Sequence, residues 1–176
     1  EMIKADRQLL AEFTAGNWHQ VFDQIDSQSP NKLSKIRLLL AIFSKLQIGN
    51  SESAHRWTKK AKQRGVEDSD IRATVLASAL TTLGRCCARQ GDAAKAESYF
   101  KDALDLLDQV GLPRYSDHTA RRFSFHQFCQ SGRFIQARQY REERVRGDSL
   151  SKLRIIHHFA CTGGTVISKC IASMRN

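Results

Sequence analysis

The residues best suited to chemistry lie near the end of the sequence, in a glycine turn. Residues 155–160 form a short apolar run of the length expected for a central parallel strand. The turn follows it, and residues 166–174 have helical spacing. A glycine turn that enters a helix presents backbone N–H groups and the positive helix end to an anion. The turn Thr162-Gly163-Gly164-Thr165, with Val166 at the start of the helix, is therefore predicted to meet an anion.

Three other kinds of site do not fit this segment. The nucleoside-triphosphate loop requires G-x-x-x-x-G-K-[ST], but Lys169 follows serine rather than glycine. A cysteine phosphatase loop needs arginine after five intervening residues, and from Cys161 that position is Ile167. His157 and His158 are neighbours, which point to opposite faces of a strand. We therefore predict no metal site and no catalytic residue in this chain.

The segment Phe159-Ala-Cys-Thr-Gly-Gly-Thr-Val-Ile-Ser168, with Cys170-Ile-Ala-Ser-Met174 after it, resembles the 5′-phosphosulfate loop of sulfotransferases. The resemblance implies that the parent protein binds 3′-phosphoadenosine 5′-phosphosulfate (PAPS), with cofactor-binding residues Thr162, Gly163, Gly164, Thr165 and Val166. Cys161 stands where that family has Arg or Lys. The base, the 3′-phosphate site and the acceptor pocket would lie beyond Asn176. We therefore expect no cofactor and no sulfuryl transfer for these 176 residues alone. Another phosphate-binding loop, or a purely structural strand and helix, are the alternatives.

The rest of the sequence must supply the framework, and it contains a repeated pattern. A glycine, four residues and a small apolar residue recur four times, at Gly16–Val21, Gly49–Ala54, Gly91–Ala96 and Gly132–Ala137. The glycines lie 33, 42 and 41 residues apart, a period typical of stacked helix hairpins. Glycine can end the first helix of a pair in the left-handed conformation, and the small residue lets two helices approach. Asn50 and Asp92 are placed to cap second helices.

The third repeat gives the clearest helical pattern. Its apolar residues at three-four spacing are Val75, Leu76, Ala79, Leu80, Leu83 and Cys87, then Ala96, Tyr99, Phe100, Ala103, Leu104 and Leu107. We expect both sets to face the core. Leu83-Gly84, Cys87, Gly91, Ala96, Phe100 and Ala103 match packing positions of the tetratricopeptide repeat (TPR) family, which this repeat resembles.

The predicted fold is all-α: a TPR-like helix-hairpin solenoid of about four helix pairs, then a short strand, glycine loop and helix from a truncated α/β domain. The boundary is expected at Gly147, giving a helical repeat domain over 1–147 and the sulfotransferase-like start over 148–176. Helices are expected at residues 3–15, 18–26, 30–47, 51–64, 69–90, 92–110, 116–131 and 133–146, with Pro30 in a first turn.

The expected partner is a protein or peptide in the concave groove of the solenoid. Aromatic residues and histidines that could line this groove, or instead pack in the core, are Trp18, His19, His55, Trp57, Tyr115 and His126. The stretch Arg114–Arg154 has ten basic and four acidic residues between Leu112 and its end, so an acidic partner could bind there. We do not expect nucleic acid, because the stretch lacks interleaved aromatic residues and a known motif.

Composition agrees with a cytoplasmic protein. Five cysteines without C-x-x-C spacing indicate reduced, buried thiols. No run approaches the ~18 apolar residues that a membrane span needs, so no membrane is expected. The function predicted from the sequence is a TPR-type interaction domain preceding a bacterial sulfotransferase-like catalytic domain that is mostly absent here. The alternatives are a stand-alone helical-repeat adaptor and a basic nucleic-acid-binding protein.

Overall fold

The fold is all-α in the part that a computed structural model describes, residues 4–27, 33–112 and 117–137. No strand occurs among these residues. The helices are α1 (Lys4–Thr14), α2 (Trp18–Asp26), α3 (Lys35–Gln47), α4 (Ser51–Gln63), α5 (Asp68–Gln90), α6 (Ala93–Gln109) and α7 (Asp117–Gln130). A further helical turn begins at Phe134. Within this part no helix is long and apolar enough to cross a bilayer.

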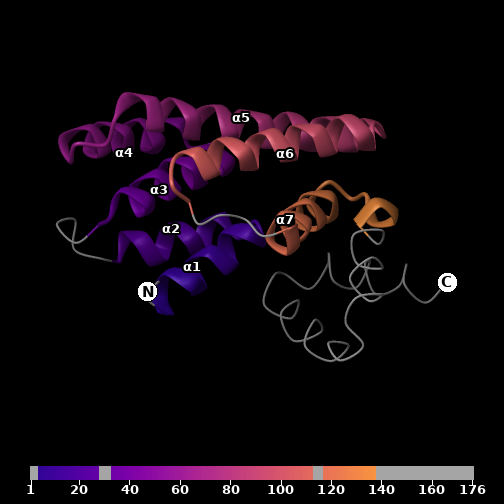
Figure 1. Cartoon of the computed structure of the whole chain (residues 1–176), viewed down its shortest axis with the longest axis horizontal. Helices are drawn as coiled ribbons and strands as arrows, with labels where there is room; N and C mark the ends of the chain where they lie inside the picture. Colours follow the sequence, from indigo (N-terminus) through magenta and orange to yellow (C-terminus); the bar gives the residue numbers. More distant parts are fainter. Residues whose placement is uncertain (1–3, 28–32, 113–116, 138–176) are drawn as a thin grey trace.

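The helices form successive hairpins, as the glycine pattern predicts. Figure 1 shows α5 and α6 side by side along one edge, with α3 between them and the α1–α2 pair. The four repeat glycines all have positive φ, which confirms their role at the ends of first helices. Gly91 is the clearest case: it caps α5 at φ 94°, where a side chain would be strained. The small residue of each repeat is buried, at Val21, Ala54, Ala96 and Ala137.

Caps fix where the second helices begin. The Asn50 carboxamide oxygen accepts from Ser53 N at 2.9 Å, and the Asp92 carboxylate accepts from Lys95 N at 3.1 Å. Both predicted caps are therefore confirmed. The expected start of the second pair at Pro30 is wrong. Leu33 and Ser34 are not helical, and the Ser34 hydroxyl caps α3 by accepting from Arg37 N.

The prediction for the third pair is half wrong. Phe100, Ala103 and Leu107 of α6 face the core as expected. On α5, however, Val75, Leu76, Ala79 and Leu83 are exposed, and Leu80 and Cys87 are only partly buried. The residues that α5 does bury are mostly small or carry hydroxyls: Ile71, Thr74, Ala77, Ser78, Thr81, Gly84 and Ala88.

Hydroxyl groups can be buried there because the helix itself satisfies them. The Thr74 hydroxyl donates to Asp70 O at 2.8 Å, and the Thr81 hydroxyl donates to Ala77 O at 2.9 Å. A buried hydroxyl with such a partner carries little penalty. The short side chains then allow α5 to lie close to α3 and α6. Apolar periodicity alone therefore identified the wrong face of α5.

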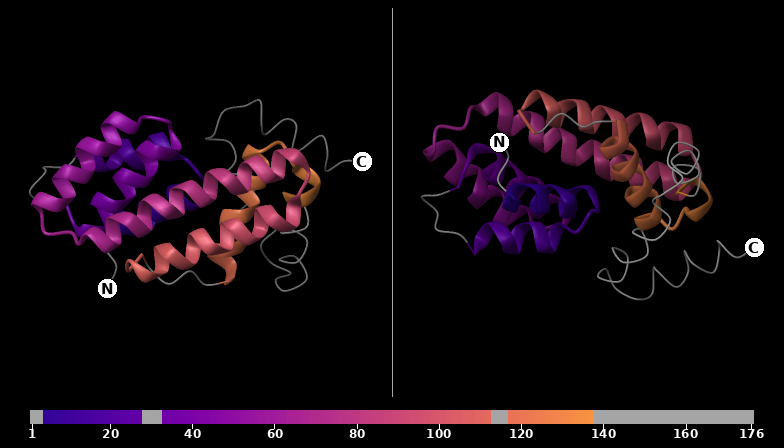
Figure 2. Two further views of the ribbon diagram at one scale, coloured as in Figure 1. Left: turned by 90° about the horizontal axis from the view of Figure 1, so that it is seen from above. Right: turned by 60° about the horizontal axis from the view of Figure 1, so that its bottom comes forward.

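The first and last described helices meet. The ring of Phe13 in α1 stacks on Phe123 of α7, with centroids 6.2 Å apart, and also contacts Phe43 of α3 at 5.0 Å. The Gln130 amide at the end of α7 donates to Gly16 O at 3.1 Å. Seen from above in Figure 2, α7 crosses beneath α5 and α6. The first helices of the four repeats thus gather around shared side chains instead of lining an open channel.

Candidate functional site

The predicted phosphosulfate loop lies outside the described residues. Thr162, Gly163, Gly164, Thr165 and Val166 therefore remain a sequence prediction, as does the boundary at 147–148. Within the described part, no group of three or more His, Cys, Asp and Glu side chains is placed to hold a metal ion. Within the described part, the candidate site lies between helices.

One pocket combines charge with aromatic walls. It lies between α2, α3 and α4 and has a volume of about 460 Å³. The residues that line it are Phe22, Asp26, Lys45, Asn50, Ser53, Arg56, Trp57 and Lys60. We call it the α2–α4 pocket. Its charged groups are three cations and the Asp26 carboxylate, so its field is positive.

Two aromatic rings form the wall. Phe22 and Trp57 make an edge-to-face pair with centroids 5.6 Å apart and planes at 89°. Trp57 belongs to α4 and Phe22 belongs to α2, so their contact joins the first and second hairpins. Both rings are largely buried, with 7% and 9% of their surface exposed. The pocket wall is thus a fixed part of the core rather than a surface flap.

Two lysine ammonium groups lie on these rings. Lys45 Nζ is 3.2 Å from the Phe22 centroid, and Lys60 Nζ is 4.1 Å from the Trp57 centroid. A cation over an aromatic face gains about 0.5–2 kcal/mol, according to its desolvation. Among the described residues neither lysine makes an ion pair. Their charge is therefore available to an incoming anion.

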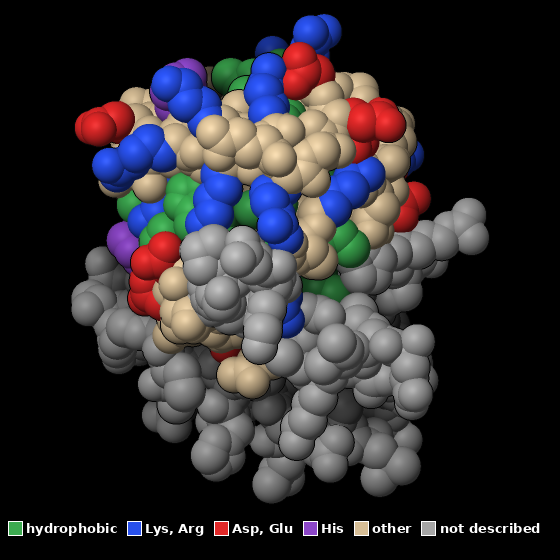
Figure 3. Space-filling model, turned by 90° about the vertical axis from the view of Figure 1, so that its left-hand side faces the viewer, with side chains coloured by type: hydrophobic (Ala, Val, Ile, Leu, Met, Phe, Trp, Pro, Cys, Tyr) green, Lys and Arg blue, Asp and Glu red, His purple; other side chains and the backbone are tan. Residues whose placement is uncertain are grey.

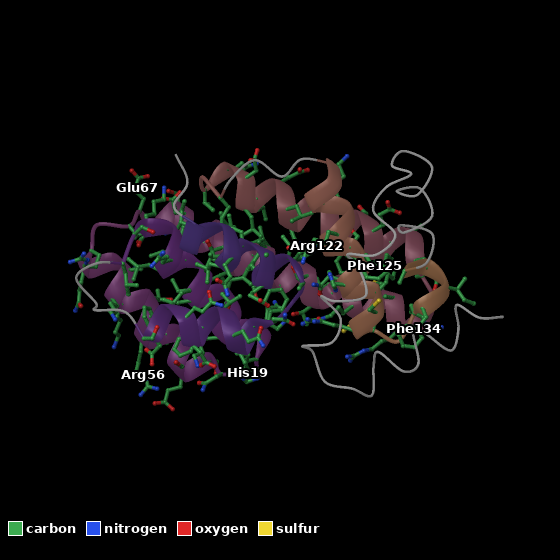
Figure 4. All side chains as sticks on the ribbon, turned by 90° about the horizontal axis from the view of Figure 1, so that it is seen from below. His19, Arg56, Glu67, Arg122, Phe125 and Phe134 are labelled. Carbon is green, nitrogen blue, oxygen red and sulfur yellow. The ribbon has the colours of Figure 1, made fainter. Side chains whose placement is uncertain are left out.

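The start of α4 opens at the same pocket. Asn50 caps this helix, and Ser53 in its first turn is buried against the pocket. The N-terminal end of a helix carries a partial positive charge. Arg56, one turn further, lies 3.9 Å from Glu52, a distance at which an exposed pair is weak. Figure 4 shows Arg56 pointing outward at the margin of the molecule, on the side where His19 of α2 also lies.

The basic character continues along α4. Arg56, Lys59, Lys60 and Lys62 oppose one acidic residue, Glu52, in this helix. Figure 3 looks at the end of the molecule where α4 lies, and shows Lys and Arg side chains across this face with apolar surface between them. The pocket thus adjoins the basic residues of α4, two of which line it.

A second polar cluster, around Arg85, joins helices of different repeats, and its polar groups bond to one another. The Arg85 guanidinium donates to Gln47 Oε1 at 2.5 Å, and to the Gln127 and Gln130 amide oxygens at 3.5 Å each. Burial lowers the pKa of Arg85 from its ordinary value, and the nearby Arg89 charge adds to this. The Gln127 side chain is fully buried. These contacts join the ends of α3 and α7 to α5, so this cluster holds helices together rather than binding a ligand.

The other predicted binding residues lie in different environments. Trp18 and Trp57 pack in the core, whereas His19 and His55 are exposed and His126 is partly buried; Tyr115 lies outside the described residues. Seven of the ten basic residues of the predicted acidic-partner stretch also lie outside the described residues. Within it, Arg133 is used internally, since its guanidinium donates to the carbonyls of Ala88 and Arg89 at the end of α5.

Sequence reasoning missed the α2–α4 pocket. A signal was present, because Trp57 lies within a run of basic residues in a single predicted helix. The contribution of Phe22 and Lys45 depends on how the hairpins pack. Comparison with protein-family models, with curated proteins and with solved structures finds no match to this chain.

Proposed function

We propose that the helical part of this chain is a TPR-like protein-interaction domain that binds an acidic peptide segment in the α2–α4 pocket. The observation that carries the proposal is the pair Lys45 and Lys60, held on aromatic rings in one pocket without a carboxylate partner. The hairpin order and the glycine-to-small-residue pattern favour a helical-repeat scaffold. Such scaffolds commonly bind peptides.

The pocket chemistry favours carboxylates. Three cations and the positive end of α4 attract an anion, and the cost of ordering the lysines is reduced because the rings already hold them. A nucleic acid would add affinity mainly by stacking bases on aromatic faces. Here the lysine ammonium groups occupy those faces, and the rings are largely buried. An acidic peptide can bind to the three cations of the pocket without contacting the ring faces.

The test uses a fluorescein-labelled glutamate-rich peptide and, as its control, the same peptide with glutamine at every glutamate. We expect the glutamate peptide to bind, measured by fluorescence anisotropy, with affinity that falls as salt rises. The double substitution Lys45→Gln, Lys60→Gln should weaken binding by about tenfold, equivalent to about 1.4 kcal/mol.

A matched pair of lysines separates pocket binding from net charge. Lys95 and Lys101 are exposed on α6, away from the pocket, and their double change to glutamine removes the same charge. We expect that variant to bind like the unaltered protein. Equal weakening by both double variants would show nonspecific attraction and overturn the proposal. Binding of a single-stranded oligonucleotide more tightly than the glutamate peptide would overturn it too.

The sulfotransferase part of the sequence prediction also remains a proposal. It concerns residues 162–166, and its test is PAPS binding by the 176-residue chain measured by calorimetry. Binding is the expected result, and its absence would contradict the resemblance. The acidic-peptide proposal stands independently of this outcome.

A further inference from the structure

The outer face of α5 is apolar and uncovered. Val75, Leu76 and Leu83 are 41%, 51% and 47% exposed, and Ala79 and Cys86 are exposed beside them. We call these five residues the α5 stripe. Figure 2 shows α6 along one side of α5 and, seen from above, no described helix lying over it. Contiguous exposed apolar surface of this kind typically marks an interaction site.

The stripe has the geometry of a helix-docking surface. Its members follow three-four spacing over about three turns of α5, so they lie on one side of the helix. Ala79 lies between Val75 and Leu83, and its short side chain would let a second helix approach closely. The opposite face of α5 is already packed, with its hydroxyls bonded to their own helix. The stripe is therefore not needed for the fold of α5.

Charge indicates what covers the stripe. Over its whole length α5 contains three arginines, and its two acidic residues, Asp68 and Asp70, already form ion pairs with Lys62 and Lys35. Arg85 is turned inward to the glutamine cluster, while Arg72 and Arg89 are exposed. A partner with carboxylates beside its apolar face would complement Arg72 and Arg89. A second copy of this chain would not, because pairing two α5 helices along their stripes brings like charges together in either direction.

We propose that the α5 stripe docks an amphipathic helix from another protein, with an apolar face bordered by Asp or Glu. This site is separate from the α2–α4 pocket, since the two share no residue. The acidic peptide at the pocket needs no helical structure, whereas the partner of the stripe must present apolar residues at three-four spacing. The domain would thus contact its partners through two surfaces of different chemistry.

The probes are two synthetic amphipathic helical peptides with the same leucine face, one bordered by glutamate and the other by lysine. We expect the glutamate-bordered peptide to bind at least about tenfold more tightly in fluorescence anisotropy, because it complements Arg72. Leu76→Asp and Leu83→Asp should each weaken that binding by about tenfold or more. Both side chains are about half exposed, so the variants should keep the circular dichroism of the unaltered protein.

Ile135 provides the matched control, since it is an apolar residue 74% exposed outside the stripe. Ile135→Asp should leave binding unchanged. Arg72→Glu together with Arg89→Glu should reverse the preference, so that the lysine-bordered peptide binds better. Lys45→Gln with Lys60→Gln should have no effect here, which keeps this test distinct from that of the pocket.

Three results would overturn the proposal. The first is equal binding of both peptides. The second is unchanged binding by the Leu76 and Leu83 variants. The third is a concentration-dependent dimer in analytical ultracentrifugation that Leu83→Asp abolishes, because the stripe would then be covered by a second copy.

Discussion

Gly84 shows how a single residue sets the distance between two helices. A Cβ placed there would overlap Cε1 of Phe100 and lie 3.1 Å from Ala96 O. Phe100 is fully buried and packs edge-to-face on Phe123 and Phe128, so its ring has little room to move. The absence of a side chain at Gly84 thus permits the closest approach of α5 to α6.

Gly84→Ala should therefore destabilise the protein by about 2 kcal/mol. Overpacking costs about 1–3 kcal/mol, and the better helix propensity of alanine offsets only part of it. Urea denaturation measures the change. In a Phe100→Leu background the same substitution should cost less, as a double-mutant cycle would show. An equal loss of stability in both backgrounds would contradict the close contact between position 84 and the Phe100 ring.

At the scale of elements, α4 and α5 are joined by a short turn and by one ion pair. Lys62 Nζ in the last turn of α4 is 2.8 Å from the carboxylate of Asp68, the first residue of α5. The hydrogen bond from the Lys62 side chain lowers the pKa of Asp68 below its ordinary value of 3.8. The charged carboxylate is therefore favoured in the folded state.

The lowered pKa of Asp68 makes the stability of the fold depend on pH. A carboxyl group with a lowered folded-state pKa contributes stability above its unfolded pKa, and this contribution disappears as pH falls through the lowered value. Asp68→Asn should thus lower the urea midpoint at pH 7, by a small amount because the pair is exposed. The difference from the unaltered protein should shrink at a pH well below 3.8.

Asp102→Asn, an exposed change in the middle of α6, is the control and should show no such pH-dependent difference. If the midpoint difference for Asp68→Asn were the same at pH 7 and in strong acid, the ion pair would not be its cause.

For the whole molecule, the decisive contact joins the first helix to the last. Phe13 touches Trp18 of α2, Phe43 of α3 and Phe123 of α7, with centroids between 5.0 and 6.2 Å. Beside it, Arg85 links α5 to the ends of α3 and α7. Residues far apart in sequence therefore share one aromatic and polar centre, and the four first helices close around it.

Phe13→Ala should be among the most destabilising single changes, at about 3–5 kcal/mol. It leaves a cavity where four helices meet. We expect a lower urea midpoint and a loss of the near-ultraviolet circular dichroism of Trp18, which packs on Phe13. Ile135→Ala, at an exposed site, should change stability by less than about 0.5 kcal/mol. A cost below about 1 kcal/mol for Phe13→Ala would mean that α1 and α7 do not share a core.

The sequence by itself determined the helices. Glycine at 16, 49, 91 and 132, with caps at Asn50 and Asp92, predicts most helix ends correctly, because these signals act through the local backbone. The start of α3 was missed, since the helix begins at Lys35 with Ser34 as its cap and not at Pro30. The spacing of these glycines also predicts successive helix hairpins, which the described helices form.

Only the tertiary structure decided which faces are buried and where a ligand could bind. Thr74, Ser78 and Thr81 look polar in a sequence, yet α5 buries them because their hydroxyl groups find partners within the fold. The apolar residues on the other side are left outside as the α5 stripe. The α2–α4 pocket likewise needs Phe22, Lys45 and Trp57 from three helices. Their meeting depends on how the hairpins pack, which local spacing does not encode.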